Sequence, residues 1–292
     1  MSRVFVLGNA SIDVTLPVPR LPAPGETLMA SGIARAPGGK GLNQAVVAAR
    51  AGVAVHFCAP LGREPETAMI RTALAAERFA DLVLPDVGQP TDLSTLLVAD
   101  DAENCIVSTG ACAEALPVSV AEAFVVAMAP DDILLLQGNL SEAATRAAAA
   151  RAAHVVVNTA PIRWPMRDVL RHATVAVANR SEAEQVTGRA DPERAALDLC
   201  RGVSIVTLGG EGCVVAAAGS VVRHPAPRVQ AVDTTGAGDT FCGMLAASLA
   251  RGMTLAAAVA VAQQAAALAV SRRGCFTALP TRVELASLLG SS

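Results

Sequence analysis

Short runs of valine, isoleucine and leucine alternate along the chain with longer, alanine-rich stretches of helical character. The apolar runs predict strands at residues 4–7, 53–59, 82–85, 133–136, 155–158, 175–178 and 203–208. The alanine-rich stretches predict helices that begin near Gly41, Glu64, Val118, Ser141, Ser181, Glu193, Gly238, Thr254 and Arg282. Because strands alternate with helices and the strand runs are continuously apolar, we expect a mostly parallel sheet covered on both faces.

Two segments interrupt this alternation. Residues 12–35 are rich in proline and end in a strand-like stretch, and residues 91–109 read as two extended strands around an acidic turn. Together they predict a small β lid over the carboxyl edge of the sheet, where open α/β folds bind their ligands. At 292 residues the chain is expected to form one domain, residues 1–292, that carries these lid segments.

Composition narrows the class of protein. Hydrophobic residues make up 52% of the chain, the net charge is −3, and aromatic residues are only 2%. The absence of a basic stripe and of stacking aromatics argues against nucleic acid as a partner. Residues 253–270 carry no charge but have two glutamines at their centre, so we expect a buried helix and no membrane partner. The seven cysteines form no C-x-x-C pair, which favours reduced thiols in the cytoplasm. The four histidines have no metal-ligand spacing.

The stretch Asp-Thr-Thr-Gly-Ala-Gly-Asp-Thr-Phe at 233–241 carries the clearest chemistry. Its glycines let the N–H groups of Gly236, Ala237 and Gly238 point into one concave site, and the following helix adds its positive dipole end. A phosphate fits there, and Asp239 could accept a proton beside it. The alternative is a purely structural turn with a favourable acidic residue in the first helical turn. Neither a Walker loop nor a dinucleotide fingerprint is present.

Three further motifs follow predicted strands or open predicted helices. Gly38, Gly39 and Gly41 surround Lys40, and with Asn43 they suit a polyol, although a solvated lysine in a glycine-rich turn is the alternative. Asn179 and Glu182 could hold Mg²⁺ through water near ATP phosphates, or could simply cap a helix. Residues 207–212, Thr-Leu-Gly-Gly-Glu-Gly, are plausible as a loop beneath a nucleotide.

The residues and spacing of these motifs resemble the two signatures of the PfkB carbohydrate kinases, the ribokinase-like family. Within that family the motifs are most similar to those of its ribokinase branch. Asp13, Pro24-Gly25-Glu26-Thr27 and Ala269-Val270-Ser271-Arg272-Arg273-Gly274 fit the same pattern, so the resemblance covers nearly the whole chain. It implies a three-layer αβα sandwich with a mostly parallel central sheet and a small β lid. It also implies ATP-dependent transfer of a phosphoryl group to a sugar.

The resemblance assigns site residues by position. It makes Asp239 the base and the turn of Gly236, Ala237 and Gly238 the anion hole. The sugar positions are Ser11, Asp13, Gly38, Gly39, Lys40, Asn43 and Asn139. The ATP positions are Asn179, Thr207, Gly209, Gly212 and Gln263, with Glu182 holding Mg²⁺ through water. A monovalent-cation site for K⁺ would use Asp233, Thr235, Val270 and Arg273, and the lid would form a homodimer.

Departures from the ribokinase pattern fall on the sugar side. Ser11 stands where that branch has an asparagine, Asn139 stands where it has a glutamate, and Gln263 replaces a histidine near the adenine. We therefore expect a kinase that phosphorylates a hydroxymethyl group on a small sugar, with a sugar site that differs from that of the ribokinase branch. A nucleoside kinase and a phosphosugar kinase are alternatives in the same family, with Arg20 and Arg35 as the basic residues near the lid. A non-catalytic sugar-binding regulator is the alternative of a different class.

Overall fold

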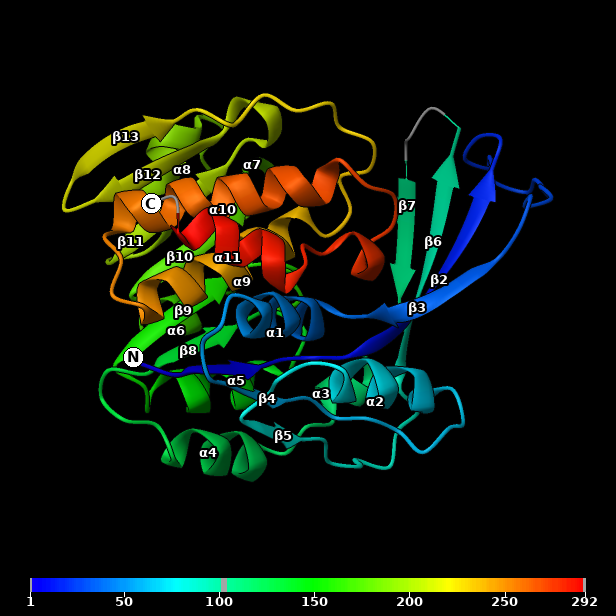
Figure 1. Ribbon diagram of the computed structural model, residues 1–292, viewed down its shortest axis with the longest axis horizontal. Coiled ribbons are helices and arrows are strands. Elements are labelled where there is room, and N and C mark those ends of the chain that lie inside the picture. Colours follow the sequence, from blue (N-terminus) through cyan, green and yellow to red (C-terminus); the bar gives the residue numbers. More distant parts are fainter. Residues whose placement is uncertain (1, 101–103, 291–292) are drawn as a thin grey trace.

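The computed structural model describes residues 2–100 and 104–290, and its largest element is a nine-stranded sheet (Figure 1). The strand order is β13-β12-β11-β10-β9-β8-β1-β4-β5. Its strands are β1 (Val4–Leu7), β4 (Val55–Cys58), β5 (Asp81–Val83), β8 (Ile133–Leu136), β9 (His154–Asn158), β10 (Val175–Asn179), β11 (Val203–Thr207), β12 (Cys213–Ala217) and β13 (Ser220–His224). In this spatial order, every neighbouring pair from β11 through β1 to β5 is parallel. Strands β12 and β13 pair antiparallel at the other edge. The expected mostly parallel sheet is confirmed.

Two layers of helices cover the sheet. One face packs against α1 (Lys40–Arg50), α2 (Thr67–Ala75), α9 (Ala237–Ala250), α10 (Leu255–Val270) and α11 (Arg282–Gly290). The other face packs against α3 (Ala111–Glu114), α4 (Val118–Val126), α5 (Glu142–Ala149), α6 (Arg167–Leu170), α7 (Arg180–Thr187) and α8 (Pro192–Leu199). Successive residues of β1 alternate between these two cores, as a strand's period of two requires. The three-layer αβα arrangement expected from the resemblance is confirmed.

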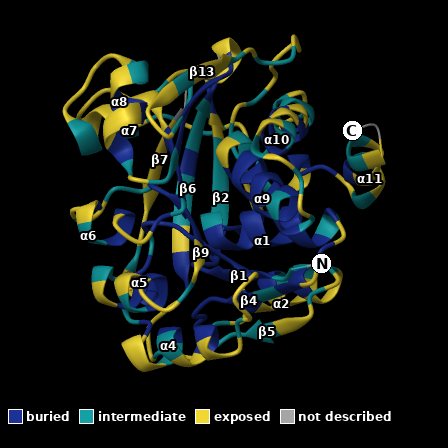
Figure 2. Ribbon diagram, turned by 90° about the vertical axis from the view of Figure 1, so that its left-hand side faces the viewer, coloured by how far each residue is buried: buried dark blue, intermediate teal, exposed yellow. Residues whose placement is uncertain are grey.

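The core is deepest around the middle of the sheet. Helices α1 and α9, which pack directly on one another, are almost wholly buried, whereas the outer helices expose one side (Figure 2). The two backbones approach closely at Gly243 of α9, where a Cβ would lie 2.5 Å from the carbonyl oxygen of Gln44 in α1. None of the helices within residues 2–100 and 104–290 combines the length and apolar character that crossing a bilayer requires.

A second sheet of four strands stands at one side of the molecule (Figure 1). It is ordered β3 (Ala34–Gly38), β2 (Ser11–Val18), β6 (Asp92–Ala99) and β7 (Asn104–Ser108), so it draws on both segments that interrupt the helical alternation. Strand β2 pairs antiparallel with β3 and parallel with β6, which places Asp13 opposite Ala36 on one side and Ser94 on the other. Residues 101–103 of the predicted acidic turn lie outside the described residues.

The sequence patterns miss the elements that are short or half exposed. The hairpin β12–β13 lies at the sheet edge, where β12 is a short buried run and β13 is mostly exposed, and α3 and α6 are single turns. The helix expected from Glu64 begins at Thr67, because the preceding residues form a turn in which Thr67 donates to the Glu64 carbonyl.

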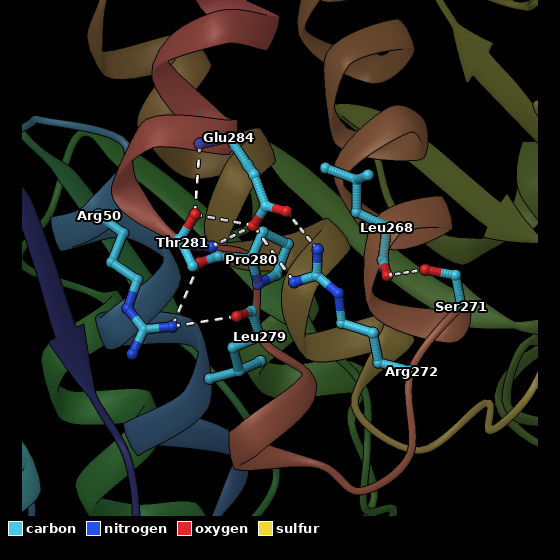
Figure 3. Close-up of polar contacts among 8 residues, drawn as sticks. All are labelled: Arg50, Leu268, Ser271, Arg272, Leu279, Pro280, Thr281 and Glu284. Carbon is cyan, nitrogen blue, oxygen red and sulfur yellow. Dashed lines mark hydrogen bonds and ion pairs between the residues drawn. The ribbon is translucent and has the colours of Figure 1, made fainter.

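The carboxyl end of the chain is tied to the helices beneath it (Figure 3). Arg50 of α1 donates to the carbonyl oxygens of Leu279 (3.1 Å) and Pro280 (3.2 Å). Arg272 forms an ion pair with Glu284, and Glu284 also accepts from the backbone and hydroxyl of Thr281 at 2.8 Å each. These contacts hold α11 against α1 and α10, on the far side of the sheet from α4 and α5.

Candidate active site

Two cavities meet at the amino terminus of α9. The smaller, of about 410 Å³, lies along the hairpin side of the large sheet, and the larger, of about 710 Å³, lies under the four-stranded sheet. Thr234 lines both cavities. Ala237 and Gly238 face the smaller one, and Gly236 and Asp239 face the larger one. The first turn of α9 is therefore the partition between two ligand-sized spaces.

The partition exposes backbone donors. Gly236 has a φ of +81°, and a Cβ on it would lie 2.9 Å from Cys275 Sγ, so this position requires glycine twice over. Ala237 N–H donates to the Thr234 carbonyl at 3.3 Å. Within the described part of the chain, the N–H groups of Gly236 and Gly238 have no acceptor. These two donors and the helix dipole together make the partition attractive to an anion.

Asp239 is buried at 6% exposure, and two amides fix its carboxylate. Gln44 Nε2 donates to Oδ1 at 2.9 Å, and Asn43 Nδ2 donates to Oδ2 at 3.3 Å. Asn43 Nδ2 also lies 3.2 Å from Cys275 Sγ. Both amides come from α1, which packs on α9, so the helix pair itself delivers the carboxylate to the cavity wall.

The larger cavity brings together most of the residues predicted for the sugar. Lys40 is half-buried there, and the Asp239 carboxylate raises the pKa of its ammonium group. Burial raises the pKa of Asp13 to about 6, although Ser11 Oγ donates to Asp13 Oδ1 at 3.0 Å. The remaining predicted residues in this lining are Gly39, Asn43 and Asn139. Gly38 is not part of it.

Gly38 and Gly39 act through the close approach of two backbones. A Cβ on Gly38 would lie 2.1 Å from the carboxyl atoms of Asp13. Gly39 has a φ of +98°, and a Cβ there would lie 2.9 Å from Ala10 Cα. These glycines let α1 begin directly against the start of β2, which sets Lys40 and Asp13 around one space.

The smaller cavity contains four of the residues predicted for ATP: Thr207, Gly209, Gly212 and Gln263. Gln263 donates to the carbonyl of His224 at 3.1 Å and is buried. The rest of the wall is mostly apolar and comes from residues 226–231 and from α9 and α10. A mostly apolar cavity that has a few polar groups and adjoins the first turn of α9 suits a nucleobase with phosphates pointing toward α9.

Asn179 and Glu182 line neither cavity and instead form a capping box. Asn179 Oδ1 accepts from Glu182 N–H at 2.8 Å, and the Glu182 carboxylate accepts from Asn179 N–H at 3.1 Å. Thr159 Oγ also donates to Glu182, at 3.0 Å. Glu182 nevertheless lies close enough to Lys40 to raise the pKa of the lysine, after Asp239 and against the effect of burial. The hydrogen bonds of this pair are thus those of a helix cap, the structural alternative.

Asp233 bridges two loops. Its carboxylate accepts from Thr235 N–H and from Gly274 N–H, both at 2.9 Å. The carbonyl of Val270 accepts from the N–H groups of Val232 (2.7 Å) and Asp233 (3.2 Å). Arg273 lines neither cavity. The segment predicted to bind a monovalent cation is therefore held together by backbone hydrogen bonds.

Several residues of the larger cavity have no motif in the sequence. They are Asn9, Ser94, Leu96, Ile106, Ser108, Thr109, Gly110, Pro161, Arg163 and Cys275. Arg163 is the most consequential, because its guanidinium donates to the Asn139 carbonyl at 2.6 Å and pairs with Glu114 at 3.0 Å. Its one sequence signal is its place shortly after strand β9, at the carboxyl edge where ligands bind. Arg20 instead pairs with Glu26, and neither Arg20 nor Arg35 lines the cavity.

Comparison with known proteins identifies relatives along the whole chain. The profile of one family, described as pfkB family carbohydrate kinase, matches residues 1–282. A ribokinase of Haemophilus influenzae is 32% identical over 297 residues, covering 97% of both chains. A ribokinase of Bacillus subtilis is 30% identical and covers 99% of this chain and all of its own.

Solved structures agree with these relatives. The ribokinase of Thermotoga maritima superposes with a TM-score of 0.89 at 28% identity, covering 99% of this chain and 100% of the other. The ribokinase of Arabidopsis thaliana, solved with ribose and ATP, superposes with a TM-score of 0.85 at 25% identity over the full length of both chains. The similarity in fold thus extends over both sheets.

Proposed function

The chain belongs to the pfkB family of carbohydrate kinases, and we propose that it transfers the γ-phosphoryl group of ATP to a hydroxymethyl group on a small sugar. An ATP-dependent sugar kinase is what the ribokinase relatives support. The observation that carries the assignment of the site is the meeting of the two cavities at the first turn of α9. ATP, the phosphoryl donor, in the smaller cavity and the sugar, the phosphoryl acceptor, in the larger one would face each other across Gly236 and Gly238.

In this proposal Asp239 is the general base. Its carboxylate takes the proton of the hydroxymethyl oxygen as that oxygen attacks the γ-phosphorus, and the bond from phosphorus to the bridging oxygen of ADP breaks. The free N–H groups of Gly236 and Gly238 donate to the oxygens of the transferring group, where negative charge is concentrated. Lys40 places a positive charge beside the same point.

The sugar is held on the lid side in this proposal. Asp13 accepts from sugar hydroxyls, while Asn43 and Asn139 offer amide groups that can donate or accept. Asn43 Oδ1 and Asn139 Oδ1 are buried without a hydrogen-bond partner, which is the condition a bound hydroxyl would relieve. Thr207, Gly209, Gly212 and Gln263 would surround the nucleotide.

The side chains around the site could bind Mg²⁺ only together with the phosphates of ATP. No group of three or more acidic, histidine or cysteine side chains that could hold a metal occurs in residues 2–100 and 104–290. Mg²⁺ would therefore reside mainly on the ATP phosphates, with Glu182 contacting its water shell. When bound, it supplies charge neutralisation between the β- and γ-phosphates.

K⁺ has the weakest structural support among the proposed ligands. The Asp233 carboxylate and the Val270 carbonyl already accept four backbone N–H groups between them. A cation could add only to the lone pairs that these bonds leave. Turnover in K⁺ compared with a bulky organic cation at equal ionic strength decides whether the segment responds.

The proposal also includes a cytoplasmic location and a homodimer. A cytoplasmic location fits seven cysteines that are all free. A homodimer through the four-stranded sheet fits the exposure of Val107 (70%) and Leu93 (39%) on that sheet. Light scattering of the purified protein tests the dimer.

A phosphorylated or acidic sugar is a second candidate because of one observation. Arg163 places a guanidinium in the wall of the larger cavity beside Asn139, which is neutral. The experiment that tests all these substrates is ATP consumption against pentoses, hexoses, nucleosides, sugar phosphates and sugar acids. Consumption that depends on one neutral sugar supports the first candidate, and no sugar-dependent consumption at all favours the non-catalytic regulator.

A further inference from the structure

A buried row of hydrogen bonds leads from the large sheet to the carboxylate of Asp239. Gln137 Nε2 donates to Gln44 Oε1 at 2.8 Å, and Gln44 Nε2 donates to Asp239 Oδ1 at 2.9 Å. The three residues come from the end of β8, from α1 and from α9, and lie 93 and 195 positions apart in sequence. Exposure is 1% for Gln137, 0% for Gln44 and 6% for Asp239.

The chemistry of the row permits only one direction. An ionised carboxylate can only accept, so Gln44 must turn its NH₂ group toward Asp239 and its carbonyl oxygen away. That oxygen then needs a donor, which Gln137 supplies. If Gln44 flipped, its oxygen would face the carboxylate and its NH₂ group would face the NH₂ group of Gln137. Gln137 therefore fixes the orientation of Gln44, and Gln44 fixes one oxygen of Asp239.

The backbone leaves a specific space for this row. A Cβ on Gly8, directly after β1, would lie 2.1 Å from Gln137 Oε1. A Cβ on Gly41 would lie 2.9 Å from Gly8 Cα, so α1 also packs closely on the end of β1. Any side chain at either glycine would displace the elements that carry the two glutamines.

Packing alone does not explain these glutamines. Gln137 Oε1 is buried with no hydrogen-bond partner, which costs free energy that an apolar side chain of similar volume would avoid. A role that depends on the direction of their hydrogen bonds accounts for a fully buried pair of amides better than packing does.

We propose that Gln44 and Gln137 are positioning residues for the general base, a role that rests on the proposed kinase function. Gln44 holds Asp239 Oδ1 so that the other carboxylate oxygen, Oδ2, faces the larger cavity and the hydroxyl to be deprotonated. Gln137 acts only through Gln44. Neither glutamine lines either cavity, so both should affect kcat and leave substrate binding unchanged.

The test is a double-mutant cycle with Gln44→Met, Gln137→Met and the double variant, and Gln185→Met on the exposed surface of α7 as the matched control. Methionine keeps the side-chain length and removes both polar atoms. We expect kcat to fall roughly 10- to 100-fold in Gln44→Met and about 10-fold in Gln137→Met, with KM for sugar and ATP within about twofold. The double variant should match Gln44→Met in kcat. Thermal stability should fall in each variant, because a buried polar group of the row loses its partner, but the loss should not follow the order of the losses in kcat.

Independent, multiplicative losses in the double variant would overturn the proposal, as would a rise in KM or a loss of kcat that tracks a loss of thermal stability. A second measurement does not depend on turnover. The side-chain amide signals of Gln44 in ¹H–¹⁵N spectra should shift in Asp239→Asn and again in Gln137→Met, but not in Gln185→Met. If no sugar is phosphorylated, the kinase proposal fails, and unchanged amide signals would separately remove the positioning role.

Discussion

The two halves of the candidate site are built in different ways. The half around α9 consists of backbone N–H groups and one carboxylate, all fixed by a long, buried helix. The half under the four-stranded sheet consists of side chains from β2, β6, β7, α1 and the loops after β8 and β9. Ser11 and Asn139, which depart from the ribokinase pattern, both belong to the second half, whereas Gly236 and Asp239 match it.

This contrast explains how one fold can keep a reaction and change its acceptor. Replacing a side chain on the lid changes the contacts of the sugar, while the donors of the α9 turn stay in place because the backbone supplies them.

The largest effect is expected in the α9 half. Asp239→Asn removes the base but keeps the shape and the neighbouring amides, so kcat should fall by about 10³-fold or more with little change in either KM. Steady-state kinetics and thermal unfolding of the same sample check this. Activity close to wild type in a folded variant would contradict the assignment of the base.

An intermediate effect is expected in the half under the four-stranded sheet, the lid half. Asn139→Glu introduces the residue type of the ribokinase branch beside Arg163, so kcat/KM for ribose should rise by about 10-fold while kcat for ATP turnover at saturation changes little. The matched variant Ser11→Asn tests the other departure. Unaltered sugar preference in both variants would place the specificity elsewhere.

A pH effect should separate the halves further. Because burial raises the pKa of Asp13 to about 6 from 3.8, the protonated form accumulates below pH 6 and can no longer accept from sugar hydroxyls through both oxygens. KM for the sugar should therefore rise as the pH falls below 6, and KM for ATP should not.

The same shift has a consequence for stability. Between about pH 4 and pH 6 the folded state binds the Asp13 proton more tightly than the unfolded state, so this group's contribution to stability falls as the pH rises through that window. Asp13→Asn should abolish both pH dependences. A sugar KM that is flat between pH 5 and pH 7 would contradict this interpretation.

The smallest effect is expected outside both halves, at the end of the chain (Figure 3). Hydrogen bonds from Arg272 lower the pKa of Glu284 to about 2, so the ion pair stabilises the folded state above the unfolded pKa and is lost as the pH falls toward 2. Because Glu284 is 31% exposed, Glu284→Gln should cost only about 0.5–1 kcal/mol at pH 7. Urea denaturation at pH 7 and pH 3 measures it, with Glu184→Gln on the exposed surface of α7 as the control, and kcat should not change.

The sequence predicts the α9 half better than the lid half for a physical reason. Gly236 to Asp239 are consecutive, so one short motif contains the turn, the donors and the base. The long apolar strands are likewise local signals, and β1 and β8 are predicted with the bounds that the structure has. The hairpin β12–β13 is not, since β12 is a short run that ends in two alanines and β13 is mostly exposed.

The lid half could not be assembled from the sequence alone. Arg163, Ser94 and Cys275 reach the cavity only through the crossing of distant segments, and no local pattern marks them. Gln44 directly follows Asn43 and Gln137 lies two positions before Asn139, but the row that they form with Asp239 depends on the packing of α1 against α9 and the end of β8. Spacing also could not decide between a capping role and a metal role for Asn179 and Glu182.

Transfer of labelled γ-phosphate from ATP tests the proposed division of labour most directly. The protein is incubated with the label and the sugar that stimulates ATP consumption, and the product is examined by phosphorus–proton coupling. We predict that the label appears on the hydroxymethyl oxygen of that sugar and that Asp239→Asn forms almost none of this product. Label found only as inorganic phosphate, or on another oxygen of the sugar, would contradict the arrangement of base, glycine turn and acceptor described for α9.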